Sequence, residues 1–290
     1  MSLTTLSEWL RCPICLCPLS PIPPLVLGCD RGHRFDTNKA GYVSLLGSQP
    51  RIAGDTGSML DARARLLDSG AYDPLIAAIA DSALTASSTL HPDARVRVVD
   101  VGSGTGHYSA GIGARLSSPT SAGILATDIA ADAVRRSVRR IGREHADGLV
   151  ADTWQPLPIR TGAADIVIDV FAPRNPGEFR RILADDGRLV VATPQRDHLI
   201  ELRRAMPMLD VPADKAERVA ADLSEFFVLE RLDPVRYTLD VTPETALALR
   251  AMGPSGHHEL AGAPTRLPGR VTVAVDVLRF RPQAPEAASA

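Results

Sequence analysis

The stretch that decides the fold is VVDVGSGTGHYSAGIGARL, residues 98–116. It opens with β-branched apolar residues, passes Asp100 and enters a turn with alternate glycines that include Gly102 and Gly104, after which a helical pattern begins. Glycines let the backbone approach a ligand closely, and the free N–H groups at a helix N-terminus face the same place. The stretch therefore predicts a strand–turn–helix unit that binds a ligand at its turn.

Short β-branched runs alternate with helical stretches on both sides of this turn. The predicted strands are VRVVDV (96–101), AGILATD (122–128), GLVAD (148–152), ADIVIDVF (164–171) and GRLVVAT (187–193), and two further candidates are FFVLERL (226–232) and VTVAVDVLRF (271–280). Helices are expected over 134–141, 177–183 and 199–223. Near-continuous apolar strands that alternate with helices indicate an α/β fold with a doubly wound, mostly parallel sheet, whose far edge the last two strands would close.

Three aspartates end three successive predicted strands. Asp100 would crowd a phosphate but suits the positively charged amino and sulfonium groups of S-adenosylmethionine. Asp128 is placed to accept hydrogen bonds from both ribose hydroxyls of NAD or S-adenosylmethionine, and Asp152 to contact an adenine amino group. Each acid alone could be a helix cap. Together with Gly102 and Gly104 they favour a nucleoside cofactor.

All four cysteines lie within the first thirty residues, as Cys12, Cys15, Cys17 and Cys29. Three of them, Cys12, Cys15 and Cys29, form with His33 the pattern C-x2-C-x13-C-x3-H, which suits a tetrahedral Zn²⁺ with three thiolates and one imidazole. By spacing alone, Cys17 could replace Cys15. The surrounding segment is rich in proline, glycine and turn residues, so it needs a metal to hold it together, and four protein ligands predict a structural site.

Composition and patterning divide the chain of 290 residues into four parts. We predict a zinc-binding module over 1–47, a linker loop and helical segment over 48–95, a cofactor-binding domain over 96–282 and a disordered tail over 283–290. Within the second part, helical spacing runs from residue 61 to residue 85, with a break near residues 69–74.

Charge and hydropathy limit the partners. The net charge of −2 gives no overall reason to bind nucleic acid, so an RNA site must be a local patch. The candidate patch consists of Arg11, Arg31, Arg34, Lys39 and Arg51. No apolar run is long enough to cross a bilayer and the first residues lack a signal-peptide pattern, which predicts a cytoplasmic protein without a membrane partner.

Several ordered segments resemble one known family. They are CPIC (12–15) with Cys29 and His33, HRFDTNKAGYVSLL (33–46), GDTGSMLDARARLLDSGAYDPL (54–75), the glycine turn, VFAPR (170–174) and VVATPQRDHLIELR (190–203). In these the chain is similar to the 23S rRNA (guanine-N1)-methyltransferases of the RlmA type, which include the enzymes that confer tylosin and mycinamicin resistance. Residues 54–75 are the most specific, because other methyltransferases lack them.

The resemblance implies a class I S-adenosylmethionine methyltransferase fold and methylation of guanine N1 in a 23S rRNA hairpin. It assigns the zinc to Cys12, Cys15, Cys29 and His33, which leaves the remaining cysteine as an extra one. It also implies a homodimer whose zinc modules help to hold the RNA, in the service of either housekeeping modification or macrolide resistance.

Further cofactor contacts follow from the resemblance alone. They are assigned to Tyr72, to Tyr108 and Ser109 after the turn, and to His198 after the fifth strand of the cofactor-binding domain. Without the resemblance, Tyr72 would be interpreted as a packing aromatic and His198 as an ordinary core or surface histidine.

VFAPR occupies the place where enzymes that methylate exocyclic amines carry a D/N-P-P-Y/F turn, which favours a ring nitrogen as the target. The cysteine pair of cytosine-C5 enzymes is also missing from the predicted domain. Guanine N1 must lose a proton as it attacks, so we predict that Asp169 or an acid near this turn assists deprotonation. Arg174 would stabilise the charge that develops on guanine O6.

Two other functions compete with this prediction. A small-molecule methyltransferase would work without RNA and leaves the zinc module without a clear task. A zinc-dependent RNA-binding protein that has lost catalysis would keep the fold alone, and the three strand-end acids argue against that alternative.

Overall fold

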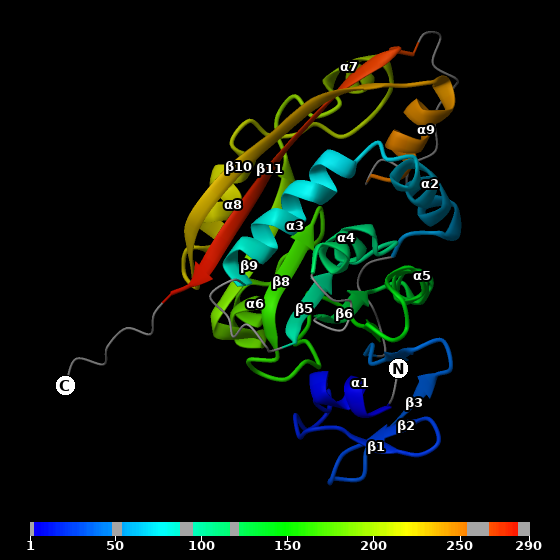
Figure 1. Cartoon of the computed structure of the whole chain (residues 1–290), viewed down its shortest axis with the longest axis vertical. Coiled ribbons are helices and arrows are strands. Elements are labelled where there is room, and N and C mark those ends of the chain that lie inside the picture. Colours follow the sequence, from blue (N-terminus) through cyan, green and yellow to red (C-terminus); the bar gives the residue numbers. More distant parts are fainter. Residues whose placement is uncertain (1–2, 48–53, 88–94, 117–121, 254–266, 284–290) are drawn as a thin grey trace, which may run out of the picture.

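One continuous sheet organises the chain (Figure 1). The structure is a computed structural model that describes residues 3–47, 54–87, 95–116, 122–253 and 267–283. Among these residues, eleven strands pair in the order β1-β2-β3-β4-β7-β6-β5-β8-β9-β11-β10.

The five central strands are parallel, as the apolar runs predict. They are β5 (Val96–Val101), β6 (Ala122–Asp128), β7 (Ala146–Val150), β8 (Ala164–Val170) and β9 (Leu183–Pro194). From β5 the chain moves outward through β6 to β7 and then crosses back to β8 and β9, so the strand order reverses between β5 and β8. Open α/β sheets bind ligands at such a switch point, at the carboxyl ends of the strands. The predicted doubly wound α/β fold is confirmed.

The two last strands close one edge of the sheet. β10 (Phe227–Asp240) pairs antiparallel with β11 (Arg270–Pro282), and β11 pairs antiparallel with β9. Both strands are longer than the predicted runs, and together they form the long hairpin along one side of the molecule (Figure 1).

The opposite edge is built by the N-terminal segment. It contains β1 (Ser20–Ile22), β2 (Val26–Gly28), β3 (Arg34–Asn38) and β4 (Tyr42–Ser44). β4 pairs parallel with β7, so these strands extend the central sheet although they are too short to show a period in the sequence. A boundary at residue 47 stays a prediction, since strand pairing joins the segment to the rest of the chain.

Helix α1 (Leu3–Trp9), which the sequence analysis does not predict, also attaches this segment to the sheet. The indole N–H of Trp9 and the hydroxyl of Thr5 donate hydrogen bonds to the carboxylate of Asp147 in β7, each at 3.2 Å. Leu6, Trp9 and Leu10 belong to the same apolar core as the central strands.

Helices cover both faces of the sheet. One face carries α1, α6 (Pro176–Ile182) and α8 (Lys215–Leu223). The other carries α2 (Gly57–Asp68), α3 (Asp73–Ser87), α4 (His107–Arg115), α7 (Ile200–Ala205) and α9 (Pro243–Ala251). The remaining helix, α5 (Ala131–Ile141), packs against β6 and β7. Alternate residues of β11 serve the two cores, as a strand requires, with Phe280 in the first and Val277 in the second.

Two predicted boundaries are wrong for identifiable reasons. The helix expected over 199–223 is two helices, because Pro207 lacks an N–H and holds Met206 in an extended conformation. α2 begins at Gly57 rather than at residue 61, because the hydroxyl of Thr56 accepts a hydrogen bond from the Met59 N–H and caps the helix.

Other expectations fall partly outside the described ranges: most of the predicted tail, much of the linker loop and Arg51. Within the described ranges, every helix is too short or too polar to span a bilayer.

Candidate active site and metal centre

The glycine turn between β5 and α4 forms the centre of the crevice. Gly102, Gly104 and Gly106 have φ angles of 70°, 53° and 77°, in the left-handed region that favours glycine. A Cβ on Gly102 would lie 2.5 Å from Cβ of Ala172, and one on Gly106 would lie 2.7 Å from Cα of Ser137. The turn therefore needs glycine both for its conformation and for its close packing.

Asp100 lies at the end of β5 with only 2% of its surface exposed. Its carboxylate accepts a hydrogen bond from the hydroxyl of Ser109, which is itself fully buried in the first turn of α4. Burial raises the pKa of Asp100 to about 7, and the nearby charge of Asp128 adds to the rise. A cation placed here would favour the ionised form of Asp100. Ser109 thus orients this acid. Its predicted contact with the cofactor stays a prediction.

Asp128 and Asp152 follow β6 and β7 as predicted, although β7 ends two residues before Asp152. The Asp128 carboxylate accepts hydrogen bonds from the N–H groups of Gly104 at 3.0 Å and Ala130 at 2.9 Å. Burial raises the pKa of Asp128, and these two N–H groups oppose the rise. Asp152 accepts a hydrogen bond from the Trp154 N–H at 3.0 Å. Both acids are thus held in place by backbone groups.

Three tyrosines form a cluster beneath the crevice. Tyr72 is fully buried, and its hydroxyl has no hydrogen-bond partner among the described residues. Burial raises its pKa, and Tyr108 and Tyr237 lie close enough to add to the rise. Tyr237 donates its hydroxyl to the carbonyl of Ala71 at 2.8 Å, which ties β10 to the segment before α3. An unpartnered buried hydroxyl is costly, so Tyr72 is a group that a ligand could satisfy.

Asp169 lies in β8 beside Val101 of β5, directly at the switch point. Its side chain is fully buried, and its Oδ2 atom has no hydrogen-bond partner among the described residues. Arg174 places Nη1 3.5 Å from the other carboxylate oxygen. Burial raises the pKa of Asp169 well above its usual range, and Arg174 opposes that rise. The two predicted catalytic residues are therefore neighbours, next to Asp100.

His198 follows β9 and faces the same region. Its Nδ1 accepts a hydrogen bond from the Ala274 N–H at 3.2 Å, so the neutral ring carries its proton on Nε2. Burial lowers the pKa of His198 to about 4, and the nearby Arg203 adds to the effect. The imidazole stacks on the ring of Phe171, with centroids 6.1 Å apart and planes inclined by 28°.

Arg63 in α2 is a crevice residue that the sequence analysis does not identify. Its Nη1 lies 2.8 Å from the position that a Cβ on Gly104 would take. The guanidinium pairs with the carboxylate of Asp55 and donates to the carbonyl of Met252 at 2.7 Å. Residues 54–75 therefore reach the glycine turn. Their specificity to the resembled family is the one signal that could have pointed to Arg63.

The predicted zinc ligands also meet. One donor atom from each of Cys12, Cys15, Cys29 and His33 lies within 4.8 Å of the others, and Cys17 is outside this group. The Cys15 and Cys29 sulfurs are 3.6 Å apart, and His33 Nδ1 lies 3.5 Å from the Cys12 sulfur and 3.3 Å from the Cys29 sulfur. Tetrahedral Zn²⁺ with bonds of about 2.3 Å to sulfur and about 2.0 Å to nitrogen needs separations of about 3.5–3.8 Å. The three short separations lie close to that range and all four donors are within 4.8 Å of one another, so the donor set suits Zn²⁺.

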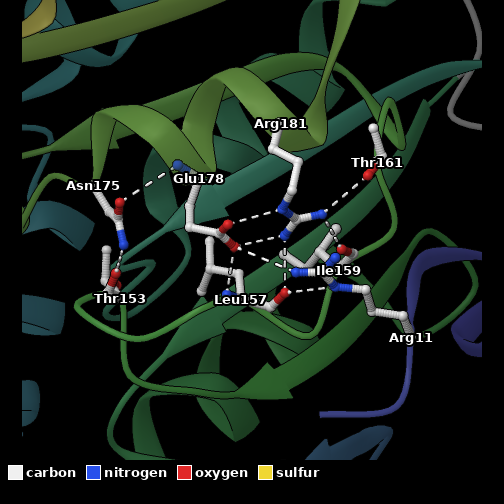
Figure 2. A network of polar contacts seen from close by, with 8 residues as sticks. All are labelled: Arg11, Thr153, Leu157, Ile159, Thr161, Asn175, Glu178 and Arg181. Atoms are coloured by element: carbon white, nitrogen blue, oxygen red, sulfur yellow. Dashed lines mark hydrogen bonds and ion pairs between the residues drawn. The ribbon is translucent and has the colours of Figure 1, made fainter. Parts of the chain in front are cut away.

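A polar network attaches the metal-binding segment to α6 (Figure 2). Arg11, next to the first ligand, donates to the carbonyl of Leu157 at 3.3 Å and lies 3.8 Å from the carboxylate of Glu178. Glu178 also accepts from Arg181 and from the Leu157 N–H, each at 2.6 Å. Asn175, which caps α6, donates to the carbonyl of Thr153 at 2.9 Å. The network thus connects the metal site with Asn175, the residue that follows Arg174.

Comparisons with known proteins agree with this geometry. A family model for the N-terminal zinc ribbon of RlmA matches residues 10–51. A 23S rRNA (guanine(748)-N(1))-methyltransferase of Streptomyces fradiae is 42% identical over 281 residues, which cover 95% of this chain and 97% of the relative.

Two further relatives are named for the same guanine-N1 methyl transfer. One, of Micromonospora griseorubida, is 38% identical over 94% of this chain and 97% of its own. The other, YxjB of Bacillus subtilis, is 31% identical over 67% of each chain. Because the identity extends along nearly the full length of the first two relatives, this chain belongs to the 23S rRNA (guanine-N1)-methyltransferase family.

Proposed function

We propose that this protein transfers a methyl group from S-adenosylmethionine to N1 of a guanine in 23S rRNA. The observation that carries the proposal is the full-length match to the Streptomyces fradiae enzyme, whose name specifies this atom and this RNA. The crevice at the switch point supports it, because it gathers acids and glycines of the kind that a nucleoside cofactor needs.

The residues at the switch point fit S-adenosylmethionine. Asp100 would bind the ammonium group, Asp128 the ribose hydroxyls and Asp152 the adenine amino group, while Gly102 and Gly104 allow close backbone approach. The unpartnered hydroxyl of Tyr72 would find a polar partner on the ligand. Tyr108 and His198 line the same region, next to Asp100 and Phe171 respectively. Bound there, the cofactor supplies an electrophilic methyl group.

The chain's own residues would hold the guanine and take its proton. Asp169 would accept the N1 proton at Oδ2, a buried oxygen that has no hydrogen-bond partner among the described residues, as N1 takes up the methyl group that the cofactor would supply. Arg174 stabilises the charge on guanine O6. Burial raises the pKa of Asp169, and a positive charge in the crevice would favour the ionised carboxylate that must accept the proton. Alignment of the reacting atoms lowers the activation barrier by up to about 7–11 kcal/mol, and proton transfer to a general base raises the reaction rate by about 10²–10⁴-fold.

Zinc would shape the surface that receives the RNA. Arg31 and Arg34 are exposed next to the metal ligands in the sequence, and Lys39 is exposed just after β3, where these residues can contact phosphates. Arg11 does not belong to the predicted patch, because its half-buried guanidinium faces Glu178 and a backbone carbonyl.

Two further parts of the proposal concern assembly and location. The family resemblance supports a homodimer, and light scattering of the purified chain should then give twice the monomer mass of 30.9 kDa. A ribosomal RNA substrate supports a cytoplasmic location.

The first experiment is transfer of labelled methyl groups to unmodified 23S rRNA. Primer extension locates the product, because a methyl group on N1 blocks the Watson–Crick edge of guanine. A single stop is expected. Cofactor binding without transfer to RNA would contradict the proposal, and activity without RNA would favour a small-molecule substrate.

The base assignment needs its own variant. Asp169→Asn keeps the shape of the side chain but cannot accept the N1 proton, so the single-turnover rate should fall by about 10²–10⁴-fold. Full single-turnover activity of Asp169→Asn would show that another group removes the proton.

A further inference from the structure

Phe171 combines an unusual backbone conformation with an exposed aromatic ring. It follows the last residue of β8, and its φ angle is 56°, in the left-handed region. For a bulky side chain this is a genuine outlier that persists only where the surroundings enforce it. Its N–H donates to the carbonyl of Ala192 at 3.2 Å, which fixes the backbone against β9. Even so, 40% of the residue is exposed, so the ring is not a core residue.

The position of this ring is set by the crevice. The next residue, Ala172, leaves no room for a Cβ on Gly102 of the glycine turn. Two residues earlier in β8 lies Asp169, and three residues later lies Arg174, which pairs with it. Phe171 therefore lies at the carboxyl end of β8, in the segment that contacts the cofactor turn and carries the predicted catalytic pair.

A second ring supports the first. The imidazole of His198 stacks on the Phe171 ring at 6.1 Å, and the Ala274 N–H fixes that imidazole through its Nδ1. Because burial keeps His198 neutral near pH 7, the pair presents an uncharged aromatic surface.

We propose that the exposed ring of Phe171 stacks on the guanine that is methylated. Enzymes that modify a base must take it out of its stack and hold it between aromatic or apolar side chains. The left-handed conformation turns the ring out of the core at the point where the base must meet the cofactor. This inference rests on the proposed function and adds to it the residue that orients the base.

Four variants separate stacking from a structural role. Phe171→Leu keeps apolar volume without an aromatic face, Phe171→Gly removes the ring and relieves the backbone, and Phe171→Tyr keeps the face. Leu232→Ala is the control, because Leu232 is equally exposed, at 43%, but lies in the edge strand β10. For each variant we would measure the single-turnover methylation rate on 23S rRNA, S-adenosylhomocysteine affinity by calorimetry, the thermal midpoint and the mass in solution.

Stacking predicts that Phe171→Leu and Phe171→Gly lose about 5- to 150-fold in methylation rate, the effect of removing one base–aromatic stack. Phe171→Tyr and the control should keep the rate, and S-adenosylhomocysteine affinity and mass should not change in any variant. Full activity of Phe171→Leu, or an equal loss of cofactor affinity, or dissociation of an oligomer would overturn the stacking. Wild-type protein that methylates no RNA would instead overturn the proposed function.

Discussion

The metal centre and the cofactor crevice are assembled in opposite ways. All four metal ligands come from residues 12–33, and their donor atoms already lie within 4.8 Å of one another. The crevice draws its residues from positions 63 to 198, on five strands and the segments between them. A local site can be encoded by spacing, whereas a distributed site depends on the strand order that brings distant residues together.

The two sites also differ in what they lack before a ligand binds. The metal donors lie within hydrogen-bonding distance of one another, at separations close to those that Zn²⁺ needs. In the crevice, the Tyr72 hydroxyl and one Asp169 carboxylate oxygen instead have no hydrogen-bond partner among the described residues, and the pKa of Asp100 is raised. We expect metal loss to act mainly on folding, and crevice changes to act mainly on ligand binding.

The largest effect should come from removing the metal. In Cys29→Ser one of four ligands is lost, and structural Zn²⁺ contributes about 10–16 kcal/mol in small zinc-binding peptides. The N-terminal strands should then unfold and lower the thermal midpoint of the whole chain, because Cys12 and Cys29 lie in its main core. Metal analysis, hydrogen exchange and calorimetry measure this.

Cys17→Ser is the matched control, because Cys17 lies outside the metal-ligand group. It should keep one zinc per chain. Equal loss of zinc from both variants would mean that Cys17 is a ligand and that the ligand set indicated by the geometry is wrong.

The second largest effect concerns cofactor affinity. Asp100→Asn removes the charge proposed to bind the ammonium group, and loss of one partner of a buried charge pair costs about 2–5 kcal/mol. S-Adenosylhomocysteine should bind at least about 30-fold more weakly by calorimetry, with zinc content unchanged. Unchanged affinity would show that Asp100 does not bind the ammonium group.

The same acid predicts a pH dependence. The pKa of Asp100 in the folded protein, about 7, lies above the ordinary value of 3.8. Between these values the folded state holds a proton that the unfolded state has lost, so this group lowers stability as the pH rises, with the full penalty above pH 7. The thermal midpoint of Asp100→Asn should therefore rise relative to that of the wild type as the pH increases from 5 to 8. Over the same pH range, the affinity of the wild type for S-adenosylhomocysteine should increase. A difference that does not change with pH would contradict the raised pKa.

A smaller effect should come from the backbone of the turn. Gly106→Ala forces a Cβ to within 2.7 Å of the Ser137 backbone at a φ of 77°, which should cost about 1–3 kcal/mol and weaken cofactor binding. Gly113→Ala is its partner in α4, where the nearest atom to a new Cβ is 3.9 Å away. There alanine should stabilise the helix by about 0.5–1 kcal/mol. Urea denaturation tests both, and equal effects would show that the turn is not constrained.

The smallest effect should come from the link between the two regions. Arg11→Ala removes the long contact to Glu178, at 3.8 Å, and the hydrogen bond to the Leu157 carbonyl, at 3.3 Å, and should cost about 1 kcal/mol with zinc retained. Glu178→Gln should cost more, because it also weakens the contacts with Arg181 and the Leu157 N–H. A double-mutant cycle measures their coupling, and a coupling of zero would show that Arg11 does not anchor the segment through Glu178.

Several features were determined by the sequence alone. Continuous β-branched runs predicted the central strands, because a strand buried on both faces needs apolar residues throughout. The spacing of the cysteines and His33 predicted a metal cluster, because its ligands are close in the chain, although spacing alone left the choice between Cys15 and Cys17 open. Asp100 and Asp128 could be located for the same reason, since each ends a recognisable strand.

Other features were decided only by the tertiary structure. The pairing of β4 with β7 depends on strands too short to show a period, and the hydrogen bond from Ser109 to Asp100 depends on how α4 follows the turn. Arg63 reaches Gly104 because α2 packs over the crevice, and Phe171 has its left-handed φ because β9 fixes its N–H. Except for the bond from Ser109 to Asp100, these contacts join residues far apart in the chain, and local patterns do not show which distant groups will meet.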